Sequence, residues 1–153
     1  MDNKEFKNLF KKIAENHGFT SAFNGWCKES EDCLFIMDLQ KSNFGNFYHL
    51  NLKTFIKGIF GRTYSIGKDL VKKDMGQIFR QQPPEFDRYL NLETIMDNAK
   101  REQGIETLFT QFILPYSKSV STLEDIQHSA QAGHLHLLPA VDKELERLIS
   151  KTP

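Results

Sequence analysis

The sequence predicts an α+β fold: an N-terminal helix, an antiparallel β-meander of three to four strands, and C-terminal helices packed on one face of that sheet. Apolar residues repeat at helical spacing in the first segment, alternate with polar residues in the middle, and return to helical spacing in the last part. A chain of 153 residues is long enough for one sizeable core. We therefore expect a single domain over 1–153, with a helix at 3–17, the sheet at about 19–82 and the helical part at about 87–150.

The segment 3–17 is predicted to form an amphipathic helix. Its apolar stripe consists of Phe6, Leu9, Phe10 and Ile13. Asp2 with Glu5 has the form of a capping box, and Gly18 is suited to the left-handed position after a helix. Phe19 is then expected to fold back onto the last helical turn.

Polar turns separate three predicted strands, which cover 25–28, 33–41 and 47–55. In the turn 42–46, Gly45 is expected to supply the positive φ angle that short hairpin loops commonly need. The strand 33–41 is apolar on both faces for most of its length, which predicts a central position in the sheet.

Along the strand 47–55 the side chains alternate. The expected core face carries Tyr48, Leu50 and Leu52, and the other face carries His49, Asn51 and Lys53. The glycine-punctuated segment 58–76 is predicted to be a mobile surface loop, and 76–80 a fourth strand at the sheet edge. Pro83 and Pro84 would end that strand, because proline has no N–H for a β-ladder.

Beyond Pro84 the apolar pattern predicts either one kinked helix or two consecutive helices, closed by Pro115. The stripe is made of Leu92, Ile95, Met96 and Ala99, followed by Ile105, Leu108, Phe109, Phe112 and Ile113. Ser121 with Glu124 predicts the start of another helix that ends at Gly133. A last helix is expected at about 139–149.

Three parts of the sequence resemble the domain-of-unknown-function 4304 family, which is found largely in bacteria. They are His17-Gly18-Phe19 after a basic helix, the hairpin string LQKSNFGNFYHLNL at 39–52, and the helical stretch 121–133. The resemblance implies a small α+β domain with no established activity, substrate or cofactor. It carries no catalytic residue over to this chain.

Amide, ammonium, hydroxyl and imidazole groups gather at the 39–52 hairpin. The candidate binding residues are Gln40, Lys41, Ser42, Asn46, His49 and Asn51. One interpretation is a site for a polar ligand at this end of the sheet. The alternative is that these short polar side chains hydrogen-bond their own turn.

Composition argues against several partners. Twenty Lys and Arg balance twenty Asp and Glu, so no net field favours nucleic acid or an anionic membrane, and neither is expected as a partner. The cluster Lys4, Lys7, Lys11 and Lys12 is interpreted as solvated helix surface. The first residues do not resemble a signal peptide, and two cysteines form no disulfide framework, so a cytoplasmic location is expected.

Two pairs of residues could suggest metal or thiol chemistry, namely two histidines near the end of the chain and two cysteines beside the first hairpin turn. His134 and His136 are two residues apart, but no third ligand stands at a recognised spacing, so neither a metal nor a cofactor is expected. Cys27 and Cys33 flank the first hairpin turn. Depending on loop length, Cys33 would stand opposite Cys27 or opposite Lys28.

These observations favour a non-catalytic cytoplasmic binding or interaction module, such as an immunity-like or accessory protein, for a protein partner or a small polar ligand. The alternative is an enzyme with an unrecognised site around the hairpin 33–41/47–55, using Lys41, His49 and Asp38. No phosphate-binding loop, nucleophile elbow or zinc-protease helix motif occurs in the sequence. Nothing in the sequence specifies the oligomeric state.

Overall fold

A computed structural model describes residues 1–151. Its centre is a five-stranded antiparallel sheet whose strands follow one another in chain order. The strands are β1 Thr20–Ala22, β2 Gly25–Glu29, β3 Cys33–Lys41, β4 Tyr48–Ile56 and β5 Ile78–Gln81. The predicted meander and the central position of β3 are therefore confirmed, with one strand more than expected.

The additional strand is β1, which pairs with β2 through a two-residue turn. Both turn residues have positive φ angles, 49° for Phe23 and 60° for Asn24. Paired positive angles are typical of tight hairpin turns, but phenylalanine rarely adopts them. A three-residue strand beside such a turn gives no recognisable alternation, which is why the sequence did not indicate it.

The first helix, α1, spans Asn3–Asn16 and matches its prediction. The Asp2 carboxylate accepts a hydrogen bond of 2.8 Å from the Glu5 amide, and Gly18 has a φ of 90°. The Phe19 amide donates to the Ala14 carbonyl at 3.1 Å, which places its buried ring beside the end of the helix.

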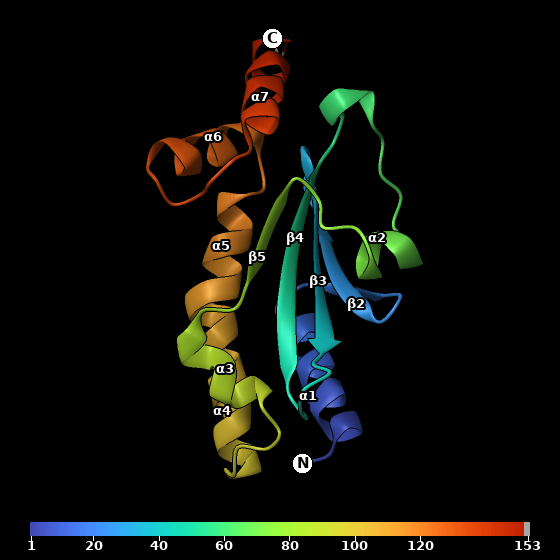
Figure 1. The fold of residues 1–153 in the computed structure, drawn as a ribbon, viewed down its shortest axis with the longest axis vertical. Helices are drawn as coiled ribbons and strands as arrows, with labels where there is room; N and C mark the ends of the chain where they lie inside the picture. The colour runs from blue at the N-terminus through green and yellow to red at the C-terminus, as the bar shows by residue number, and fades with distance from the viewer. Residues whose placement is uncertain (152–153) are drawn as a thin grey trace.

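The helices after β5 cover one face of the sheet (Figure 1). Two short segments come first, the 3₁₀ turn Pro84–Phe86 and α3 Asp87–Leu90. Then α4 Asn98–Leu108, the π-helical segment η3 Phe109–Ile113 and α5 Leu114–Ser119 follow without a break. The chain ends in α6 Leu123–Gln131 and α7 Pro139–Lys151.

Several predictions for this part were wrong. Pro115 does not close the helix, because the wide π turn before it accommodates a residue that lacks an N–H. The stretch 92–97 is not helical, and Ile95 is almost fully exposed. Helix α6 is capped by Thr122, whose side chain accepts from the Asp125 amide at 3.0 Å, rather than by Ser121.

The predicted loop 58–76 contains two helical segments, the 3₁₀ turn η1 Ile59–Gly61 and the helix α2 Lys68–Lys72. Helix α2 lies on the opposite side of the sheet from α4 and α5 (Figure 1). It buries Leu70 and Val71 in a second apolar cluster that also contains Leu34, Ile36 and Phe55. This packing explains why β3 is apolar on both faces; a five-residue helix is too short to show a period in the sequence.

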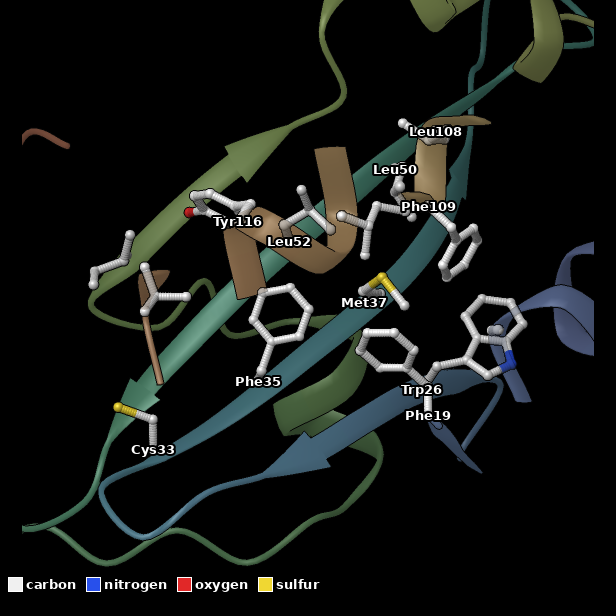
Figure 2. Close-up of a cluster of buried hydrophobic side chains, with 14 of the residues drawn as sticks. Phe19, Trp26, Cys33, Phe35, Met37, Leu50, Leu52, Leu108, Phe109 and Tyr116 are labelled. Carbon is white, nitrogen blue, oxygen red and sulfur yellow. The ribbon is translucent and has the colours of Figure 1, made fainter. Parts of the chain in front are cut away.

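The main core lies between the sheet and the long helix. Figure 2 shows Phe19, Trp26, Phe35 and Met37 from the sheet side meeting Phe109 of η3. The tilted contact between Phe10 of α1 and Phe109, with ring centroids 5.3 Å apart, joins α1 to the same core.

The two cysteines lie on opposite faces of the sheet. Cys27 pairs with Ile36 across β2 and β3 and contacts the second cluster, whereas Cys33 is buried in the main core. The Ser30 amide donates to the Cys33 carbonyl at 2.9 Å and tightens the turn. Neither of the two expected pairings for Cys33 occurs.

Candidate functional site

Two of the predicted binding residues are brought together on the α2 side of the sheet. The Asn51 amide donates to Gln40 Oε1 at 3.0 Å, and Gln81 donates to Asn51 Oδ1 at 2.9 Å. The three side chains therefore form an amide ladder across β3, β4 and β5. Gln81 was not among the predicted residues, because an exposed glutamine on an edge strand carries no distinctive pattern.

Two others serve the hairpin turn. The Ser42 hydroxyl accepts from the Phe44 backbone amide at 3.0 Å, and the Asn46 backbone amide donates to Glu93 Oε2 at 3.3 Å. The side-chain Oδ1 of Asn46 is buried without a hydrogen-bond partner among the described residues. Gly45 does not have the positive φ that was expected. A Cβ atom there would lie 2.6 Å from Glu93 Oε2, the end of an exposed flexible side chain that would have to move.

Lys41, His49 and Asp38 do not converge. Lys41 is exposed and stands opposite Tyr48, whose side chain belongs to the main core, while Asp38 and His49 alternate onto the other face. The His49 ring makes an edge contact with Phe47, at 5.6 Å between centroids. The enzyme alternative requires these three side chains to act together, and the structure does not bring them together.

Beside the amide ladder lies a buried ion pair that the sequence analysis did not identify. Asp38 Oδ1 and Lys53 Nζ are 3.4 Å apart, and both side chains are almost fully buried. Lys53 also donates to the Val71 carbonyl at 2.6 Å, and Lys72 Nζ lies 3.9 Å from Asp38 Oδ2. The available signal was the acidic Asp38 within the apolar part of β3 and the basic Lys53 on the neighbouring strand.

A larger hollow, which we call the lysine cleft, has a volume of about 950 Å³. It lies between the first part of α1 and the β1–β2 hairpin, and Leu39 of β3 and Lys72 of α2 complete its wall. A smaller groove of about 410 Å³ begins at the same two residues and runs along Asp38, Gln40 and Asn51. Lys72 therefore stands between the cleft and the predicted polar residues.

The charge of the cleft has one sign. Lys4, Lys7 and Lys11 follow one another at helical spacing and line it together with Lys72, and no Asp or Glu occurs among the described lining residues. The nearest compensation for Lys11 is Glu15 at 3.9 Å, in an exposed pair. Three of the four lysines that were interpreted as solvated helix surface therefore face a concave site.

Lys72 is the most constrained of these lysines. It donates to the Asn24 carbonyl at 2.9 Å, which ties α2 to the hairpin turn. Burial lowers the pKa of Lys72; Asp38 opposes this effect, and the positive charges of Lys7 and Lys53 add to it. The lysines on the two walls of the cleft therefore repel one another.

Gly25 determines how closely the hairpin approaches α2. A Cβ atom at this position would lie 2.5 Å from Val71 Cγ1 and 2.8 Å from the Met37 carbonyl oxygen. Only glycine leaves room for this packing, which holds Lys72 at the mouth of the cleft.

Trp26 forms the apolar floor of the cleft. Its ring packs against Phe10 at 4.8 Å between centroids, and only 6% of the residue is exposed. The indole N–H has no hydrogen-bond acceptor in the described part of the chain. Figure 2 shows this nitrogen at the margin of the cluster, directed away from Met37 and Phe109. Trp26, with its unpartnered indole N–H, therefore lines the same cleft as the four lysines.

No family model, curated protein or solved structure matches this chain. Its resemblance to the domain-of-unknown-function 4304 family therefore stays a prediction. Within residues 1–151, no group of three or more His, Cys, Asp or Glu could hold a metal ion, and His134 and His136 are both exposed. Across the same residues no helix is long and apolar enough to cross a membrane. The fold and the lysine cleft define an α+β protein with a basic cavity that has an aromatic floor.

Proposed function

We propose that this chain is a binding module whose lysine cleft takes a small organic polyanion with a flat aromatic part. The observation that carries the proposal is the set of four lysines around a cleft with no acidic residue in its lining. The volume of the cleft lies within the usual range for small-molecule sites, which is about 300–1,000 Å³.

The charges support an anionic ligand. Lys7 and Lys72 both line the cleft, and the positive charge of Lys7 lowers the pKa of Lys72, so like charges repel across the cleft. A bound anion would remove that repulsion and accept hydrogen bonds from the ammonium groups. Affinity should therefore fall as rising pH deprotonates Lys72.

The floor supports an aromatic part. Trp26 and Leu39 present apolar surface at the bottom of the cleft, and Phe23 stands half-exposed at its rim. A flat ring can stack on these groups, and an acceptor on that ring would satisfy the buried indole N–H. The groove beyond Lys72, with Gln40 and Asn51, would contact polar substituents of the same ligand.

The proposal keeps the expected non-catalytic role and a small-ligand partner. It also places the protein in the cytoplasm, which is supported by two free cysteines on opposite sheet faces. An immunity-like or accessory role fits a binding module of this size. Nucleic acid is a poor occupant, because the chain carries no net positive charge outside the cleft's local cluster.

The test uses ATP as the probe and two control compounds. Adenosine has the same aromatic ring but no negative charge, and tripolyphosphate has the negative charge but no ring. By isothermal titration without magnesium, ATP should bind, tripolyphosphate more weakly and adenosine not measurably. Lys7→Met and Lys72→Met should each weaken ATP binding by roughly tenfold. Lys12→Met is the matched control, because Lys12 is on the same helix but does not line the cleft.

Equal loss in the Lys12 and Lys7 variants would mean that binding is only diffuse surface attraction and would overturn the proposal. The same conclusion would follow if no probe bound. Affinity for single-stranded oligonucleotides that rises steadily with their length would replace the small ligand by nucleic acid.

A further inference from the structure

A second hollow, of about 320 Å³, lies on β5, η3, α5 and the segment after α6. Its lining includes Arg80, Phe112, Tyr116, His134 and Leu135. It shares no lining residue with the lysine cleft or with the groove beside it. We call it the Arg80 pocket.

Arg80 is held by aromatic rings rather than by an acid. Its guanidinium carbon lies 4.7 Å from the centroid of Phe112 and 5.4 Å from that of Tyr116. The two rings are themselves stacked, with centroids 5.5 Å apart and planes at 10°. No carboxylate lies within ion-pair distance of Arg80 in residues 1–151, so stacking orients the cation and leaves its N–H edges available.

Tyr116 supplies the second observation. The residue is only 7% exposed, and its hydroxyl has no hydrogen-bond partner among the described residues. Burial raises the pKa of Tyr116 to about 12, with the charge of Arg80 opposing, so the phenol is neutral and can donate a hydrogen bond. Figure 2 shows the Tyr116 oxygen directed away from Leu52 and the other labelled core side chains.

The π turn builds the wall of this pocket. The Leu114 amide donates to the Phe109 carbonyl five residues earlier, and Pro115 follows without an N–H of its own. This widened turn carries Phe112 and leads directly into the turn that carries Tyr116. Single π turns inside α-helices are frequently found at functional sites.

We propose that the Arg80 pocket binds a small carboxylate that carries an apolar body. The planar carboxylate takes the free edge of the Arg80 guanidinium in a two-pronged contact and accepts a hydrogen bond from the Tyr116 hydroxyl. The apolar body lies against Phe112 and Leu135, and the exposed His134 borders the opening. This site does not depend on the proposed function of the lysine cleft.

The experiment follows amide and arginine Nε–Hε signals of the full chain by NMR while benzoate is added. Benzamide, which has the same shape without the charge, is the matched probe. Benzoate should cause saturable shifts at Arg80, Phe112, Tyr116 and Leu135, and benzamide should not. Because benzoate is an anion, the titration is repeated with Lys7→Met, which should leave the shifts at these residues unchanged.

Two variants separate binding from folding. Tyr116→Phe removes only the unpartnered hydroxyl, so its thermal midpoint should stay equal or rise while benzoate affinity falls by roughly three- to tenfold. Arg80→Lys keeps the charge but loses the planar fork, so affinity should fall by roughly tenfold or more. Equal shifts with benzamide, unchanged affinity in both variants, or a large loss of stability in Tyr116→Phe would each overturn the proposal.

Discussion

At the scale of single residues, two of the six buried side-chain polar atoms without a hydrogen-bond partner in residues 1–151 belong to residues that line the two proposed sites. The Trp26 indole and the Tyr116 hydroxyl are both buried without a hydrogen-bond partner in the described chain, and each borders a hollow that also holds cationic side chains. A buried unsatisfied donor commonly costs about 1–3 kcal/mol. Both proposals use these donors to bind an anionic ligand.

The buried pair of Asp38 and Lys53 provides a test at this scale. Asp38→Leu should reduce the free energy of unfolding by about 3–5 kcal/mol, because Lys53 is left charged in an apolar layer. The double variant Asp38→Leu, Lys53→Met should recover most of that loss. Urea unfolding measures all three proteins. If the double variant were as unstable as the single one, the cost would come from lost packing rather than from an unpaired charge.

At the scale of elements, the cleft lies between α1 and the β1–β2 hairpin, and the contact of α2 with the hairpin completes its wall. Neither segment has a strong local signal, because α2 has five residues and β1 has three. Their positions follow from contacts between them: Lys72 donates to the Asn24 carbonyl, and Gly25 packs under Val71. The cleft therefore depends on a tertiary contact between two weak elements.

Gly25→Ala should disturb this contact. The new methyl group would overlap Val71 Cγ1 and the Met37 carbonyl, and an overpacked site of this kind typically loses about 1–3 kcal/mol of stability. ATP affinity should fall as well, because α2 carries Lys72. The control is Gly67→Ala, where no atom lies within 4 Å of the added Cβ and φ is −166°. Equal stability of the two variants in urea would contradict the described packing.

At the scale of the whole molecule, the buried thiol and phenol make stability depend on alkaline pH. Burial raises the pKa of Cys33 from 9.0 to about 12 and that of Tyr116 from 10.0 to about 12. A group with a raised folded pKa stabilises fully below its unfolded pKa, and this contribution is lost as pH rises through the folded value. The two groups therefore destabilise the fold between pH 9 and pH 12.

The free energy of unfolding should thus decline between pH 9 and pH 12, with Cys33 contributing up to roughly 4 kcal/mol of the decline. Lys72 opposes part of this loss, because its lowered pKa makes folding more favourable as it deprotonates. Cys33→Ala should start less stable at neutral pH but show a flatter decline in urea unfolding at each pH. A slope identical to that of the unchanged chain would exclude Cys33 as the cause.

Much of the fold could be predicted because its signals are local. Helix α1, strand β3 and the core face of β4 follow from period, capping residues and alternation, and the structure confirms them. The wrong predictions concern residues whose conformation depends on neighbouring structure as well as on their own residue type. Pro115 continues a helix because a π turn precedes it, and Gly45 does not adopt the positive φ angle that its hairpin position suggested.

The predicted binding residues also depend on tertiary contacts that the sequence does not show. The side chains of Gln40 and Asn51 are hydrogen-bonded to each other. Gln40 pairs with His49 across β3 and β4, and Asn51 lies two residues beyond His49 on the same face of the sheet. Lys41 alternates to the other face, Ser42 accepts a hydrogen bond within its own turn, and the Asn46 backbone amide donates to the distant Glu93. The sequence alone cannot show which polar group is already satisfied, because most of the partners are distant along the chain.

The sequence by itself determined the α+β class, the meander and the amphipathic first helix, since these depend on patterns within about ten to twenty neighbouring residues. Only the tertiary structure decided that Lys4, Lys7 and Lys11, which are exposed to solvent, line a cleft, and that Lys72 completes its wall. It also brought Arg80 onto the rings of Phe112 and Tyr116. The physical reason is that the interaction energy of a charged side chain depends on its burial and on the charges around it. Both are set by segments that are distant in sequence.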